Sequence, residues 1–126
     1  MKPLSIVVAD DVEEIQTLVR QWLDDVGHLV TCVSSGGEAT KLLKRQHFDL
    51  VITDVLMPDG DGLDVIRELR RTPDTRVLAI SGGGRHMQAI DCLNVAKGMG
   101  AHAVLFKPFS RQQLLRAVET ACPDRP

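Results

Sequence analysis

Residues 50–63 read LVITDVLMPDGDGL, and the interpretation of the whole chain starts from this stretch. Its first four residues are apolar or β-branched, as in a strand buried on both faces of a parallel sheet. Asp54 follows that run directly, and Met57-Pro58 and the glycines beyond favour a turn. Asp61 can then cap a helix whose apolar residues recur at helical spacing. The stretch therefore predicts a strand with a polar end, a loop and a helix.

The same alternation of short strands and amphipathic helices continues on both sides of this stretch. Five short runs are apolar on both faces, which predicts fully buried strands of a parallel sheet. A helical pattern follows each of them. Ser35 with Glu38 and Ser110 with Gln113 match the capping box that marks a helix start. Such alternation implies βαβ crossovers and a three-layer α/β sandwich. The predicted strands are 4–9, 29–33, 50–53, 77–80 and 103–106, and the apolar residues of the helices fall in 15–26, 39–43, 63–69, 90–96 and 114–122.

The composition is that of an ordinary globular protein and excludes several classes. With 126 residues, 44% hydrophobic and 25% charged, the chain can form one domain with one core. A formal net charge of −2 gives no electrostatic case for binding nucleic acid or an anionic membrane. The apolar runs near the start are too short for a signal peptide or a membrane span, so we expect a cytoplasmic protein.

Polar side chains at the strand ends carry the predicted chemistry. The carboxyl ends of parallel strands meet at one edge of a sheet, which is where ligands bind in open α/β folds. We therefore expect three carboxylates, one hydroxyl and one ammonium to converge in a shallow cleft. They are Asp10 and Asp11 after the first strand, Asp54 after the third, Ser81 after the fourth and Lys107 after the fifth.

Each of these residues also has a plain structural explanation. Asp11 alone could cap the first helix, and Asp54 could be a turn residue before the loop. Ser81 could be a turn hydroxyl and Lys107 a solvated lysine. Their joint placement favours a functional site, because accidental caps and turn residues rarely share one edge.

The cluster of carboxylates predicts a hard divalent cation, most simply Mg²⁺. Three carboxylates so close together repel and cannot all stay ionised unless a cation lies among them. Mg²⁺ prefers oxygen ligands and often bridges them to a phosphate. A carboxylate beside Mg²⁺ and a lysine can attack phosphorus and form an aspartyl phosphate. Lys107 and the metal would neutralise the phosphoryl oxygens, and Ser81 would donate a hydrogen bond to one of them.

Taken together, these residues resemble the receiver domains of two-component response regulators, of the single-domain chemotaxis type. The resemblance covers essentially the whole chain, with 1–122 as the receiver domain and 123–126 as a short C-terminal tail. It implies a flavodoxin-like fold with strands in the order 2-1-3-4-5, five flanking helices and no output domain. The matching motifs are Asp10-Asp11, DVLMPDGDG at 54–62, Ser81 and Lys107-Pro108-Phe109.

The resemblance also assigns roles within the site. Asp54 is implied to be the phosphoacceptor, with a histidine kinase or a histidine phosphotransfer protein as the donor. Asp11 and Asp54 are implied to bind Mg²⁺ directly, and Asp10 largely through water. The backbone carbonyl of Leu56 is implied as a further metal ligand.

At the end of the fifth strand, Lys107 is implied to contact the phosphoryl group, and the bond from Lys107 to Pro108 is implied to be cis. The domain would catalyse its own phosphotransfer rather than act as an enzyme on other molecules. It would signal to a downstream protein or pass the group onward in a phosphorelay, as a monomer or weak homodimer.

Three features depart from the family pattern. Val104 stands where the family usually has a tyrosine or phenylalanine that turns inward, so the usual aromatic switch is not expected. The residues two positions after Asp54 and Ser81 often set how fast receivers lose the phosphoryl group. Here they are Leu56 and Gly83, which cannot orient an attacking water, so we predict slow self-dephosphorylation. The stretch from Ser81 to Lys107 is longer than is common in the family, and its glycine-rich start could cradle a phosphate. The glycines do not form a nucleotide-binding motif, so a flexible hinge is predicted instead. These glycines are Gly82, Gly83 and Gly84.

Two other functions stay open on the sequence alone. A receiver fold that has lost signalling could act as a phospho-independent interaction module, against which the complete set of polar residues argues. A small phosphatase of the haloacid dehalogenase type would use an aspartyl nucleophile in a D-x-D motif. Asp10-Asp11-Val12 does not match that motif, and no cap domain is expected.

Overall fold

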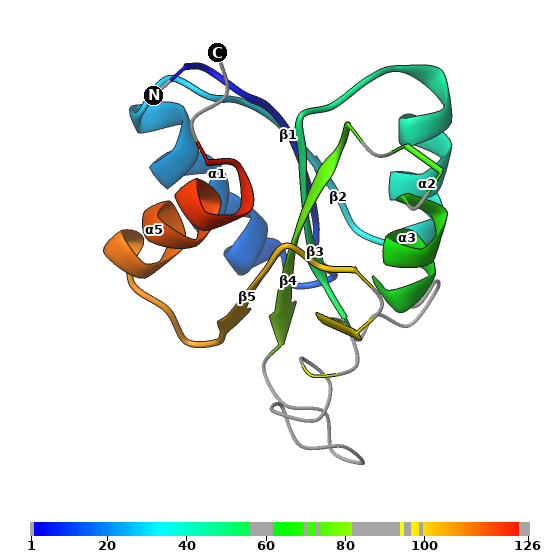
Figure 1. Ribbon diagram of the computed structural model, residues 1–126. Helices are drawn as coiled ribbons and strands as arrows, with labels where there is room; N and C mark the ends of the chain where they lie inside the picture. The colour runs from blue at the N-terminus through cyan, green and yellow to red at the C-terminus, as the bar shows by residue number, and fades with distance from the viewer. Residues whose placement is uncertain are drawn as a thin grey trace.

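The computed structural model describes residues 2–55, 62–69, 71–72, 74–81, 94, 97–98 and 100–123. Within these ranges five strands and four helices follow one another along the chain (Figure 1). The predicted helix around residues 90–96 falls largely outside the described residues, and so do Leu56, Gly82, Gly83 and Gly84. The elements are β1 (Ser5–Ala9), α1 (Glu13–Asp25), β2 (Leu29–Val33), α2 (Gly36–Arg45), β3 (Leu50–Asp54), α3 (Gly62–Leu69), β4 (Arg76–Ser81), β5 (Ala103–Phe106) and α5 (Arg111–Ala121).

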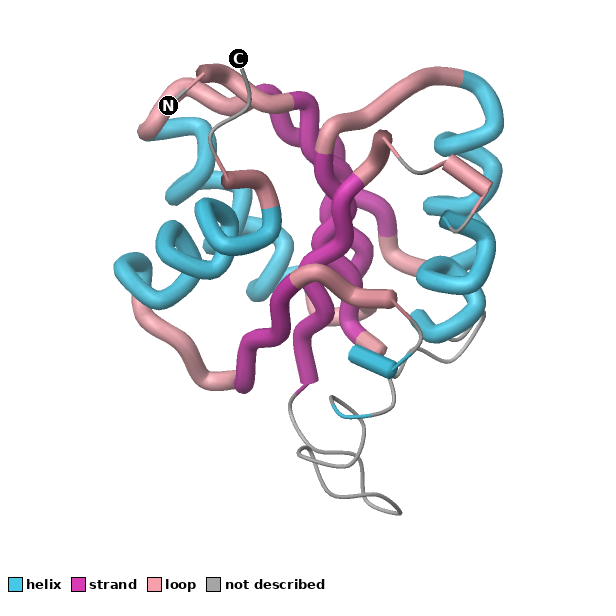
Figure 2. The backbone as a smooth tube through the Cα atoms, viewed as in Figure 1, coloured by secondary structure: helices cyan, strands magenta, loops and turns pink. Residues whose placement is uncertain are grey.

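The five strands form one parallel sheet in the order β2-β1-β3-β4-β5. Helices α1 and α5 cover one face of this sheet, and α2 and α3 cover the other (Figures 1 and 2). The predicted three-layer, flavodoxin-like fold and its strand order are therefore confirmed. Because every strand runs in the same direction, all of their carboxyl ends lie at one edge of the sheet.

The two faces of the sheet bury separate apolar clusters, because successive side chains of a strand point to opposite faces. In β1, Val7 and Ala9 pack in the cluster shared with α2 and α3. Their neighbours Ile6 and Val8 pack in the cluster shared with α1 and α5. The same alternation holds in β3 and β4, so the three central strands are buried on both faces as the sequence predicts.

The two edge strands are more exposed than their apolar sequences predict. Leu29 at the start of β2 is 71% exposed, and Phe106 at the end of β5 is 46% exposed. The expectation of strands buried throughout was wrong for these two. An edge strand has a neighbouring strand on one side only, so part of its apolar surface faces solvent.

Side chains cap the starts of α2 and α5 as predicted. The Ser35 hydroxyl accepts a hydrogen bond from the Glu38 backbone N–H at 3.1 Å. Ser110 and Gln113 form a complete capping box, in which each side chain accepts from the other residue's backbone N–H. The longest described helix, α1, has 13 residues. Within the described ranges, no helix combines the length and apolar character needed to cross a membrane.

Candidate functional site

The carboxyl edge of the sheet carries all five polar residues predicted for the site. Asp54 and Ser81 are the last residues of β3 and β4. Asp10 directly follows β1, and Lys107 directly follows β5. In the sheet, Asp54 pairs with the residue before Ser81, which places the ends of β3 and β4 side by side. Residues that are far apart in the sequence therefore meet because their strands are parallel and end at the same level.

One ammonium group is shared by two carboxylates at this edge. The Lys107 Nζ lies 2.8 Å from Asp10 Oδ2 and 2.8 Å from Asp54 Oδ2. All three side chains are largely buried, with exposed fractions of 16% for Lys107, 2% for Asp10 and 9% for Asp54. Charges attract more strongly in such surroundings than in water. The lysine therefore ties the end of β5 to the ends of β1 and β3.

The environment of Lys107 keeps its amine protonated. Burial lowers the pKa of this lysine, because a charged group loses hydration. The hydrogen bonds to Asp10 and Asp54, together with their negative charges, outweigh burial and raise the pKa above its ordinary value. At neutral pH the site therefore holds a fixed positive charge beside two carboxylates.

Asp10, Asp11 and Asp54 form a cluster suited to a cation. Each offers one carboxylate oxygen, and these oxygens lie within 4.8 Å of one another. Asp11 is exposed while the other two are buried. Apart from its ion pair with Lys107, the buried Asp10 Oδ2 accepts no hydrogen bond from the described residues. Three carboxylates beside one ammonium leave negative charge uncompensated, and hard oxygen donors of this kind fit Mg²⁺.

Asp11 does not cap helix α1, which was the plain structural explanation for this residue. The N-cap of α1 is Val12, and this helix start has no side-chain cap. Asp10, not Asp11, accepts the Val12 backbone N–H, through Oδ1 at 2.8 Å. Asp11 is therefore an exposed carboxylate at the cluster rather than a helix cap.

The ends of β4 and β5 are joined beside the acidic cluster. The Lys107 backbone N–H donates to the Ser81 carbonyl at 2.9 Å. Ser81 is 1% exposed, so its position is fixed by its surroundings. The peptide bond from Lys107 to Pro108 is cis, as the resemblance implies. Ser81 and Lys107 are thus neighbours at this edge.

Val104 lies in β5 on the same face as the apolar cluster under α2 and α3. It is partly buried and packs against that cluster. Two residues further along β5, Phe106 is 46% exposed at the carboxyl edge. The position of the usual aromatic switch therefore holds a small, branched side chain that packs against the core.

Two residues next to the site were not predicted from the sequence. The Gln16 side-chain amide donates to the Asp10 carbonyl at 2.6 Å. At Gly62, the first residue of α3, an added Cβ would overlap the Asp54 carbonyl and lie 2.7 Å from the Val55 Cα. The Asp-Gly sequence before α3 could have indicated a close backbone approach at Gly62. Nothing local indicates the role of Gln16.

Comparison with known proteins agrees with this geometry. Residues 6–119 match the family described as response regulator receiver domain. The chain is 34% identical over 122 residues to the DNA-binding transcriptional regulator NtrC of Azospirillum brasilense, which covers 96% of this chain and 24% of that one. The chain spans about a quarter to a half of the length of the curated relatives it matches.

Solved structures show the same likeness. The chemotaxis response regulator CheY4 of Vibrio cholerae superposes with a TM-score of 0.83 at 25% identity, over 95% of this chain and 99% of that chain. The beryllofluoride-activated NtrC4 receiver domain dimer gives a TM-score of 0.82 at 32% identity, over 92% of this chain and 93% of that chain. Both likenesses extend over nearly the full length of the compared chains.

Proposed function

The chain belongs to the response regulator receiver domain family, and on that premise we propose that it accepts a phosphoryl group on Asp54 in a Mg²⁺-dependent reaction. Receiver domains are phosphoacceptor signalling domains of two-component systems. The proposed donor is a histidine kinase or a histidine phosphotransfer protein. The observation that best supports Asp54 as the acceptor is its burial at the carboxyl edge, 2.8 Å from the ammonium of Lys107.

In the proposed reaction, a carboxylate oxygen of Asp54 forms a bond to phosphorus as the P–N bond to the donor histidine breaks. The imidazole nitrogen leaves with the electron pair of that bond. Lys107, which carries a positive charge at neutral pH, is proposed to contact the transferring oxygens with its ammonium group and so stabilise the transition state. The Ser81 hydroxyl is proposed to donate a hydrogen bond to one of these oxygens.

Asp10, Asp11 and Asp54 are proposed to hold the metal, supported by the proximity of their carboxylate oxygens. Asp11 and Asp54 would be direct ligands, Asp10 would act through water, and Leu56, outside the described residues, would add its backbone carbonyl. When bound, Mg²⁺ supplies positive charge to the phosphoryl oxygens.

Phosphorylation adds nearly two negative charges to the site, and the effect must reach a surface that a partner reads. We propose that the signal passes through protein contact or a phosphorelay, and not through an aromatic switch, because Val104 is small and packs against the core. Slow self-dephosphorylation is proposed from the residue types of Leu56 and Gly83, both outside the described residues.

We propose residues 1–122 as the receiver domain and 123–126 as a tail, since α5 ends at Ala121. The recipient of the signal is proposed to be a protein rather than nucleic acid or a membrane, because the formal net charge is only −2. The proposed form is a monomer or a weak homodimer. The dimer is included because the NtrC4 receiver domain was solved as an activated dimer. The cytoplasmic location stays a prediction.

The test is intact mass after incubation with acetyl phosphate, with and without Mg²⁺. Wild-type protein should gain the mass of one phosphoryl group only when Mg²⁺ is present. Asp54→Asn should gain none, because its amide cannot act as the acceptor. Asp49→Asn is the matched control, because Asp49 lies at the opposite end of β3, and it should gain the group as wild type does.

The outcome that contradicts the proposal is a folded protein that gains no mass from acetyl phosphate or from any histidine kinase of a representative panel. Such a result would favour the phospho-independent module. Equal modification of wild type and Asp54→Asn would instead place the acceptor elsewhere.

A further inference from the structure

Gln16 joins the ends of two strands through its side-chain amide. Its Nε2 donates to the Asp10 carbonyl at 2.6 Å, the Val33 carbonyl at 3.3 Å and the Ser34 hydroxyl at 3.2 Å. Val33 is the last residue of β2 and the last to pair with β1, opposite Ala9. The Val33 carbonyl also accepts the Asp10 backbone N–H at 3.2 Å. Gln16 therefore holds the backbone where β1 and β2 separate, directly beside the acidic cluster.

Two hydrogen bonds join Asp10 to the first turns of α1, one through its side chain and one through its backbone carbonyl. Its Oδ1 accepts the Val12 backbone N–H at 2.8 Å, which fixes the carboxylate to the start of the helix. Gln16, in the next turn of the same helix, donates back to the Asp10 carbonyl. With its backbone and Oδ1 both held, Asp10 directs Oδ2 towards the Lys107 ammonium, 2.8 Å away.

The orientation of Asp10 matters because this residue is the least exposed of the three clustered aspartates. A group that is already oriented loses little conformational freedom when a ligand binds. Groups that orient the residues around a metal typically contribute 10–100-fold to its affinity. Gln16 contacts the backbone of Asp10 rather than its carboxylate, so the effect should be at the lower end of that range.

We propose that Gln16 is a positioning residue that sets Mg²⁺ affinity by orienting Asp10. The proposal rests on the proposed function, since it assumes that the acidic cluster binds Mg²⁺. Gln16 takes no part in phosphoryl transfer itself, because its amide contacts carbonyls and a hydroxyl on the β1–β2 side of the cluster.

The experiment compares Gln16→Met with Gln21→Met in the full chain. Methionine matches glutamine in length but donates no hydrogen bond. Gln21 lies on the same helix and is exposed, so its replacement controls for the change of side chain. We expect Gln16→Met to weaken Mg²⁺ binding about tenfold by calorimetry, and Gln21→Met to bind Mg²⁺ as wild type does.

A second measurement separates positioning from general destabilisation. The rate of phosphorylation by acetyl phosphate is followed over a range of Mg²⁺ concentrations. Gln16→Met should need about tenfold more Mg²⁺ for half of its maximal rate, while that maximal rate stays close to wild type. A loss of folded protein would instead lower the maximal rate at every Mg²⁺ concentration.

A third measurement needs no metal. In metal-free protein, hydrogen exchange of the Val12 amide reports the bond to Asp10 Oδ1. This amide should exchange faster in Gln16→Met than in Gln21→Met. If wild type binds no Mg²⁺, the proposed function fails, and slow exchange in both variants then also overturns the role of Gln16. If wild type binds Mg²⁺ and both variants titrate alike, only the inference about Gln16 is overturned.

Discussion

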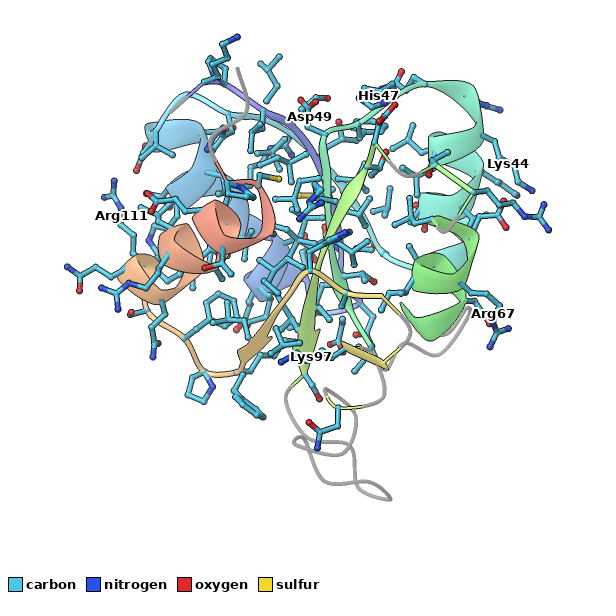
Figure 3. The ribbon with its side chains drawn as sticks, viewed as in Figure 1. Lys44, His47, Asp49, Arg67, Lys97 and Arg111 are labelled. Atoms are coloured by element: carbon cyan, nitrogen blue, oxygen red, sulfur yellow. The ribbon has the colours of Figure 1, made fainter. Side chains whose placement is uncertain are left out.

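The two ends of the parallel sheet use similar side chains in opposite ways. At the carboxyl ends, Asp10, Asp11 and Asp54 converge on one another, and Lys107 pairs with two of them, Asp10 and Asp54. At the amino ends, one aspartate and two histidines lie apart, and each accepts a backbone N–H of a neighbouring strand. Figure 3 shows Asp49, with His47 close by, at this second end. The three bonds are Ser5 N–H to Asp49 Oδ2 at 2.8 Å, Leu4 N–H to His28 Nδ1 at 2.9 Å and Val77 N–H to His102 Nδ1 at 3.0 Å.

This difference separates side chains that accept backbone hydrogen bonds from side chains that could hold a cation. At the amino ends, each side chain satisfies a backbone donor that would otherwise lose a hydrogen bond on burial. At the carboxyl ends, the described residues place three carboxylates beside a single ammonium. The hydrogen bonds at the amino ends stabilise the fold. The aspartate cluster at the carboxyl ends could bind a cation.

The largest expected effect concerns the tight packing at the carboxyl end. Gly62→Ala should lower the free energy of unfolding by about 3 kcal/mol, because the new Cβ overlaps the rigid Asp54 carbonyl. Gly98→Ala is the matched control, since a Cβ there meets no atom within 4 Å. Urea unfolding of both variants measures the difference. Equal stability of the two variants would show that α3 can move away from β3 at little cost.

A pair of identical substitutions should change stability in opposite directions at the two ends. In metal-free protein, Asp54→Asn should raise the free energy of unfolding by about 1 kcal/mol, because the relief of repulsion among three carboxylates outweighs the loss of one of the two ion pairs of Lys107, which keeps Asp10 as its partner. Asp49→Asn should lower it by about 1 kcal/mol, because the charged acceptor for the Ser5 N–H is lost. Urea unfolding in the presence of a chelator tests both. A change of the same sign would remove the contrast between the two ends.

The smallest expected effect is a pH dependence that arises at the amino end. Burial, followed by the positive charge of the N-terminus, lowers the pKa of His28 below its ordinary value of 6.5. The unfolded chain therefore binds this proton at a higher pH than the folded protein does. Stability should be fully present above about pH 6.5 and should fall as the pH drops towards the lowered pKa.

Replacing the imidazole isolates this contribution. The loss of unfolding free energy between pH 7 and pH 5 should be smaller in His28→Gln than in wild type, since only wild type carries the titrating group. Denaturant unfolding at several pH values gives the two slopes. Equal slopes would mean that folding does not lower the pKa of His28.

Most of the fold could be predicted because it follows from local pattern. Runs that are apolar on both faces predict the central strands, and the capping residues predict where two helices begin. The prediction of full burial was wrong for β2 and β5, because a sequence does not say which apolar strands will lie at the edges of the sheet. Leu29 shows this, since its neighbours in the sequence resemble those of a central strand while its side chain is 71% exposed.

The site was predictable for a different reason. The direction of parallel strands brings their ends together, so Asp54 and Lys107 could be placed at one edge without knowing any distance. Gln16 could not be found in this way, because the carbonyls it binds belong to strands that precede and follow its own helix. Gly62 required knowledge of how closely α3 approaches β3. Contacts set by packing rather than by strand direction are the part that the sequence leaves open.

The ion pairs of Lys107 can form only late in the synthesis of the chain. Asp10 and Asp54 leave the ribosome well before Lys107, because the cation follows the last strand of the sheet. A nascent chain thus displays its acidic groups while the group that pairs with them has yet to be translated. A fragment that stops short of β5 keeps the Asp54 carboxylate but lacks this ammonium. The site therefore becomes complete only when the sheet does, which ties the chemistry of the molecule to the completion of its fold.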